Sequence, residues 1–177
     1  MAAARKRAPR KTAAKASATK TKTVGAIRAG NGKYHFRMSK LKKVPAGTGY
    51  STSHGGVVEG ARILVGYIHK PRGTGSRMHK HNNEQLNYVL QGTLVGSVNG
   101  KRVVAPAGTL VYIPANAPHN LVSTKDEDVI FLAVKDLSQG IIGKAVDGTM
   151  TGPHYEKGFG PAAKARKKTR TKAAARK

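Results

Sequence analysis

Two histidines separated by a single residue, His79 and His81, lie in the segment SRMHKHNNEQLNYVLQG at residues 76–92. Residues two apart on a β-strand point to the same face, so both imidazoles could bind one metal ion. A lone His-x-His pair is more often a surface or hydrogen-bonded pair. The next candidate donor is Glu84 or Gln85. Neighbouring strand residues point to opposite faces, so only one of these two could join the site, and the choice sets its charge.

Short runs of apolar and β-branched residues predict the elements that would position these side chains. The runs occupy residues 61–69, 85–90, 93–98, 101–105, 109–114, 120–123 and 128–134. Turn sequences rich in Gly, Pro, Asn and Asp separate them, and Asn99-Gly100 predicts a two-residue hairpin. Many short strands at this spacing favour an all-β sandwich or barrel. A chain of 177 residues leaves room for one such domain.

Two linked motifs in this region resemble those of the cupin superfamily. Gly73 is followed by five residues, His79-Lys80-His81, three residues, Gln85, six residues and Gly92. A second motif runs from Gly100 through Pro106-Ala107-Gly108 and Pro114 to His119. The resemblance covers about residues 60–135. It implies a cupin-type jelly-roll β-barrel.

The resemblance also implies a metal site made by His79, His81, Gln85 and His119. The motif spacing selects Gln85 over Glu84 at a position where cupins usually have glutamate, and Ser123 stands where the motif ends in asparagine. Gln85 is either a weak ligand through its amide oxygen or a donor that orients bound water or substrate. The expected cofactor is one divalent ion, with Fe, Mn, Zn and Ni all compatible with imidazole-rich sites.

A neutral donor set leaves the ion its full positive charge, which favours an anionic or enolisable small molecule. Arg77 shares strand parity with the two histidines and could pair with a substrate carboxylate, or could lie on the rim. Tyr67 and Tyr88 are candidates for substrate contact or proton transfer, with core packing as the alternative. His35, His54, His69 and His154 lack motif support.

The predicted function is a metal-dependent cupin enzyme, either a dioxygenase or a Lewis-acid lyase or cyclase. Three-histidine centres in cupins recur in enzymes that cleave C–C bonds with dioxygen. The alternative is a non-catalytic module that binds a small ligand and is tethered to nucleic acid or other polyanions by basic tails. Cupin barrels often pair through sheet faces or edges, so a homodimer is expected.

The ends of the chain differ from its middle in composition. Residues 1–22 contain eight Lys and Arg and residues 157–177 contain nine, without any acidic residue, in a chain with a net charge of +25. We expect disordered basic tails at 1–23 and 157–177 around a barrel at 24–156. They resemble the Lys/Ala-rich tails of bacterial linker-histone-like proteins. Such tails either bind nucleic acid or other polyanions non-specifically or only aid solubility.

Cysteine is absent, which excludes disulfides and thiolate ligands or nucleophiles. The apolar runs are too short to span a bilayer, and no secretory signal is visible. These features predict a cytoplasmic protein without a membrane partner.

Overall fold

The computed structural model describes residues 20–146, 148 and 152–161. Within these residues the regular structure is almost entirely β, with one short 3-10 helix, η1, at Met38–Lys40. The strands are β1 (Ile27–Arg28), β2 (Val44–Pro45), β3 (His54–Glu59), β4 (Ile63–Lys70), β5 (Thr74–Gly75), β6 (His79–Lys80), β7 (Gln85–Gln91), β8 (Thr93–Val98), β9 (Lys101–Pro106), β10 (Leu110–Ile113), β11 (His119–Ser123), β12 (Val129–Asp136), β13 (Lys144–Ala145) and β14 (His154–Tyr155).

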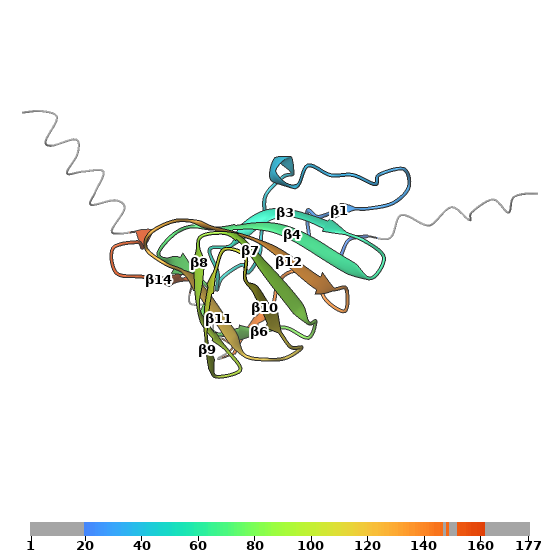
Figure 1. The fold of residues 1–177 in the computed structure, drawn as a ribbon. Helices are drawn as coiled ribbons and strands as arrows, with labels where there is room; N and C mark the ends of the chain where they lie inside the picture. The colour runs from blue at the N-terminus through green and yellow to red at the C-terminus, as the bar shows by residue number, and fades with distance from the viewer. Residues whose placement is uncertain (1–19, 147, 149–151, 162–177) are drawn as a thin grey trace, which may run out of the picture.

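The strands form two sheets that face each other (Figure 1). The first sheet has the order β1-β3-β4-β12-β7-β10, with β2 beside β3. The second has the order β13-β6-β11-β5-β14, and the β8–β9 hairpin joins it through β11. Several sheet neighbours are distant in sequence, such as β4 and β12 or β5 and β11, as in a jelly roll, so the predicted all-β jelly-roll architecture is confirmed.

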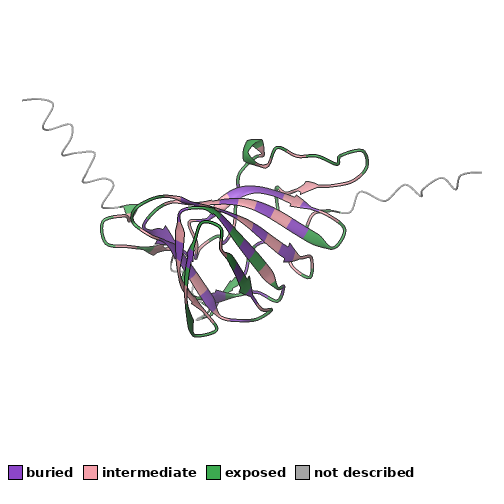
Figure 2. Cartoon of the chain, in the orientation of Figure 1, coloured by how far each residue is buried: buried purple, intermediate pink, exposed green. Residues whose placement is uncertain are grey.

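Alternating burial along the strands defines the interior of the barrel, as Figure 2 shows. On β12, Val129, Phe131 and Ala133 are buried, whereas the residues between them are only partly buried. The same period-2 pattern buries Leu64 and Ile68 on β4. The inner faces of the two sheets therefore share one hydrophobic core, and the side chains between these positions point outward.

The predicted hairpin at Asn99-Gly100 joins β8 to β9. Val98 pairs with Lys101, which leaves two residues in the loop. Both have positive φ, 49° at Asn99 and 78° at Gly100. This backbone is the one that a two-residue hairpin turn requires and that Asn-Gly adopts at low cost.

Residues at both ends of the described chain pack against the barrel. The backbone N–H groups of Lys22 and Thr23 donate to the buried Glu59 carboxylate at 2.8 and 2.7 Å. Near the other end, Phe159 lies so close to Gly73 that a Cβ there would be 2.3 Å from its ring. Thr23 and Phe159 therefore contact the barrel, although both fall within the tails expected at 1–23 and 157–177. Most of both tails, residues 1–19 and 162–177, lies outside the described residues.

No helix in the described part of the chain has the length and apolar character needed to cross a membrane.

Candidate metal centre

Three buried histidines meet inside the barrel. His79 on β6 and His119 on β11 are direct cross-strand partners, and His81 is the residue directly after β6. One ring nitrogen from each lies within 4.8 Å of the others. The ring centroids of His79 and His119 are 4.0 Å apart, and those of His81 and His119 are 4.8 Å apart. The strand pairing thus brings together the three histidines that the two motifs predict.

Backbone carbonyls orient all three imidazole rings in the same way. The Nδ1 atoms of His79, His81 and His119 lie 2.9, 2.7 and 2.9 Å from the carbonyl oxygens of Arg77, Asn83 and Ala117. A carbonyl can only accept, so each Nδ1 carries the proton and each Nε2 keeps its lone pair. The Nε2 atom of His81 is buried and has no protein partner among the described residues. This is the arrangement of a histidine prepared to bind a metal.

Burial keeps these imidazoles neutral. It lowers the pKa of His79 to about 2, that of His81 to about 4 and that of His119 to about 3, from an ordinary value of 6.5. Smaller electrostatic effects from the other histidines and from buried lysines act in the same direction. Three neutral nitrogen donors fit a divalent transition-metal ion. The residues present therefore suit the cofactor that the motifs imply.

Gln85 faces the same cavity, and Glu84 does not. The Gln85 amide donates a hydrogen bond to Oδ1 of the buried Asn87 at 2.6 Å, so its carbonyl oxygen is the group left for an ion or a water molecule. It is near enough to His81 to oppose, slightly, the effect of burial on the pKa of that ring. Glu84 is exposed and accepts a hydrogen bond from the Tyr112 hydroxyl at 3.1 Å. The two neighbouring side chains therefore point to opposite sides, Gln85 to the cavity and Glu84 to the solvent.

The histidines lie in a small cavity of about 50 Å³. At about 10–15 Å³ per water molecule, the enclosed space suits an ion with a few water-sized groups. Its polar wall includes Tyr50, Ser53, Lys70, Gln85 and Asn87. None of the described residues that line it is acidic. The cavity is therefore electropositive whenever Lys70 is charged.

Two buried lysines and a buried tyrosine surround the site and were not predicted from the sequence. Burial lowers the pKa of Lys70, which lines the cavity, and of Lys135, which lies close by on β12, to about 7 in each case. The Tyr50 ring lies 4.4 Å from that of His79, and its hydroxyl accepts the Gly143 N–H at 2.7 Å. Burial raises the pKa of Tyr50 to about 12, so this hydroxyl stays protonated.

The structure corrects the placement of the three predicted catalytic side chains. Arg77 is exposed, because β6 begins only at His79 and the strand parity does not extend back to it. Tyr67 and Tyr88 lie on β4 and β7 between residues that face inward, so they project from the outer face of the sheet. Tyr88 is 42 % exposed. None of the three lines the cavity with the histidines.

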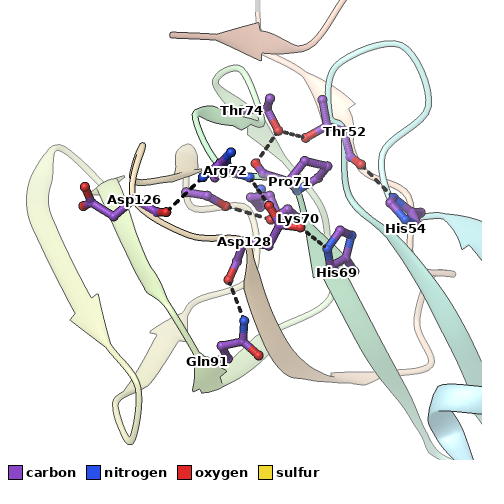
Figure 3. Close-up of polar contacts among 11 residues, drawn as sticks. Thr52, His54, His69, Lys70, Pro71, Arg72, Thr74, Gln91, Asp126 and Asp128 are labelled. Atoms are coloured by element: carbon purple, nitrogen blue, oxygen red, sulfur yellow. Dashed lines mark hydrogen bonds and ion pairs between the residues drawn. The ribbon is translucent and has the colours of Figure 1, made fainter. Parts of the chain in front are cut away.

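Two further histidines form a separate polar cluster at the end of β4 (Figure 3). His54 and His69 are cross-strand partners with ring centroids 5.0 Å apart. His69 Nε2 lies 2.8 Å from Asp128, whose other carboxylate oxygen accepts the Arg72 N–H. That backbone hydrogen bond is the main reason why the pKa of Asp128 lies below its usual value. This cluster ties the loop before β12 to β4, and neither His54 nor His69 lines the three-histidine cavity.

Comparisons with known proteins agree with the fold. The cupin domain family model matches residues 66–135, which include all three histidines. The solved polyketide cyclase RemF from Streptomyces resistomycificus superposes with a TM-score of 0.52 at 18% identity, covering 58% of this chain and 78% of that chain. An RmlC-like cupin from Shewanella frigidimarina gives a TM-score of 0.48 at 20% identity, covering 58% and 88%. None of the curated proteins matches the sequence.

The domain match over residues 66–135 and the superposition on RemF support a cupin-type fold. At these identities the structural similarity concerns the fold.

Proposed function

We propose that this protein is a metal-dependent cupin enzyme acting on a small anionic or enolisable molecule. The observation that carries the proposal is the convergence of His79, His81 and His119, each held through Nδ1 by a backbone carbonyl so that Nε2 is available. Gln85 completes the set, as a weak ligand or as the residue that orients water or substrate. The ion is divalent, with Fe, Mn, Zn and Ni as the candidates.

A divalent ion bound there would supply Lewis acidity at a substrate oxygen, and an iron or manganese ion could also supply redox chemistry with dioxygen. The residues of the chain do the rest. Apolar side chains such as Ile68, Leu121 and Phe131 line part of the cavity, and the backbone carbonyls fix the imidazoles. Tyr50 keeps its proton because of its raised pKa, so it acts as a hydrogen-bond donor and not as a base.

Lys70 is the side chain of the cavity wall that changes charge near neutral pH. No carboxylate among the described residues lines the cavity, so a glutamate base of the usual cupin kind is missing. Burial lowers the pKa of Lys70 to about 7, which gives this amine both a neutral and a charged form near neutral pH. A dioxygenase is our first choice of reaction. A Lewis-acid lyase or cyclase is the second.

The test is a screen of the purified protein loaded separately with Fe, Mn, Ni and Zn. Each form is given small enolisable carboxylic acids, with dioxygen uptake and product formation both recorded. Activity with one ion, lost in His119→Ala, supports the proposal. A protein that binds an ion at full occupancy and turns over no such acid, with or without dioxygen, contradicts the enzymatic function and leaves the binding module.

A further inference from the structure

Lys70 is a buried amine placed in the wall of the histidine cavity. It is the last residue of β4, on the inward face, and is 3 % exposed. Its Nζ donates a hydrogen bond of 2.8 Å to the carbonyl oxygen of Leu121 on β11, and Lys70 belongs to the polar contacts at the end of β4 drawn in Figure 3. This bond crosses from one sheet to the other. It holds the amine in a fixed position at the cavity.

The same carbonyl also fixes a hydroxyl group beside the amine. Ser76 Oγ donates to the Leu121 carbonyl oxygen at 3.2 Å and accepts the Leu121 N–H at 3.1 Å. Ser76 is buried and lines the same cavity as Lys70. An amine and a hydroxyl anchored on one carbonyl form a rigid polar corner of the cavity.

Lys70 has no anionic partner in the part of the chain that the structure describes. The ion pairs there join His69 to Asp128, and Lys125 and His154 to Glu156. A charged ammonium has three donors, and only one is used, on Leu121. Burial of a charge without a partner is costly, and a second, anionic partner removes that cost. The same burial of the amine away from water lowers the pKa of Lys70 to about 7.

We propose that Lys70 binds the carboxylate of the substrate, which makes the substrate a small carboxylic acid with an oxo or enol oxygen next to the acid group. The carboxylate lies against Lys70 Nζ, and the second oxygen is directed to the three histidines that line the same cavity. A cavity of about 50 Å³ admits the acid group and the adjacent carbon atoms, and the remainder of a larger molecule would extend toward the opening. This second contact rests on the proposed metal-dependent function. The contact with Lys70 does not.

The test is calorimetric titration of the metal-free full-length protein with pyruvate, the smallest acid of this class. We expect saturable binding that weakens about tenfold or more in Lys70→Met, because the buried charge-assisted contact is lost. Lys80→Met, on the exposed side of β6, is the matched control and should bind as the unmodified protein does. Pyruvamide, which lacks the charge, should not bind. Lys70→Gln replaces Lys70→Met if the latter does not fold.

Three results would overturn the inference. The first is no pyruvate binding by the unmodified protein at pyruvate concentrations up to about 10 mM, which is in the range of weak dissociation constants. The others are equal binding by Lys70→Met and loss of binding in Lys135→Met alone. Metal content is measured on the same samples. Lys70-dependent pyruvate binding by a protein that takes up no metal contradicts the proposed enzyme and leaves the acid site intact. Full metal occupancy with unchanged pyruvate binding in Lys70→Met contradicts the acid site alone.

Discussion

Lowering the pH from 6.5 to 5.5 should destabilise the metal-free protein, because its three cavity histidines are buried in the neutral form. Their pKa values of about 2, 4 and 3 in the folded state lie below the ordinary value of 6.5. As the pH falls, these histidines therefore bind protons at a higher pH in the unfolded chain than in the folded chain. A difference of this sign contributes stability above pH 6.5 that is progressively lost as the pH falls toward the folded-state values.

The magnitude follows from proton linkage. Between pH 6.5 and 5.5 a histidine that titrates only in the unfolded chain lowers the free energy of unfolding by about 1 kcal/mol, so three lower it by about 3 kcal/mol. Lys70 and Lys135, with pKa values of about 7 against 10.5, exert their effect mainly at higher pH. In this window they add about 0.3 kcal/mol together. A loss of 3 kcal/mol is a large part of the 5–15 kcal/mol typical of a whole domain.

Urea denaturation of the metal-free protein at several pH values measures this loss directly. His119→Asn should reduce the change between pH 6.5 and 5.5 by about a third, or about 1 kcal/mol. His35→Asn, at an exposed position, serves as the control and should leave the change as it is. A free energy of unfolding that stays constant within about 0.5 kcal/mol over this window would refute the reasoning, since the histidines would then be no more buried than in the unfolded chain.

Three further outcomes are expected. Gln85→Ala should weaken metal binding only partly and Glu84→Ala should leave it unchanged, as measured by competition with a chelator; the reverse order would mean that the register is wrong. We propose a homodimer through the outer face of the first sheet, where Tyr88 and Leu110 are cross-strand partners and 42 % and 56 % exposed. Leu110→Glu should give a monomer by light scattering. An unmodified protein that is already monomeric at micromolar concentration would rule the dimer out. Removing both ends to leave residues 20–161 should abolish salt-sensitive binding to duplex DNA and preserve metal binding, because most of the net charge lies outside that range. If the shortened protein still binds duplex DNA at moderate salt, the binding belongs to the barrel instead.

Local spacing predicted an all-β sandwich or barrel and placed His79 and His81 on one strand face, whereas the jelly roll and the full ligand set came from the resemblance to cupins. Strand-like runs joined by an Asn99-Gly100 turn predict a hairpin. The spacing of His79 and His81 from Gly73 and Gln85 fixes their positions in the motif, and on a strand both histidines point to the same face. His119 required more than spacing: only the resemblance of the second motif connected it to the first.

The remaining cavity residues were beyond sequence reasoning because long-range packing positions them. Tyr50 lies in a loop without any motif. Its position at the site is fixed by the hydrogen bond that its hydroxyl accepts from the distant Gly143 N–H. Lys70 ends a strand and would ordinarily be read as a solvated lysine; its burial depends on β11, some 50 residues later, whose Leu121 carbonyl accepts its hydrogen bond. For Arg77 the sequence left both a cavity and a rim position open, because the start of β6 is a boundary that apolar pattern alone defines poorly.

The most direct test of the metal centre is elemental analysis of the full-length protein after dialysis, with unmodified protein and the single variants His79→Ala, His81→Ala and His119→Ala compared side by side. Each variant should remain folded by circular dichroism, and His35→Ala provides the matched control. We expect about one divalent ion per chain in the unmodified protein and in the control, and loss of most of it in each cavity variant, since three neutral donors cannot be reduced to two without a large loss of affinity. Full metal content in any one of the three cavity variants, or no metal in the unmodified protein even after incubation with Fe, Mn, Ni and Zn, would contradict this expectation.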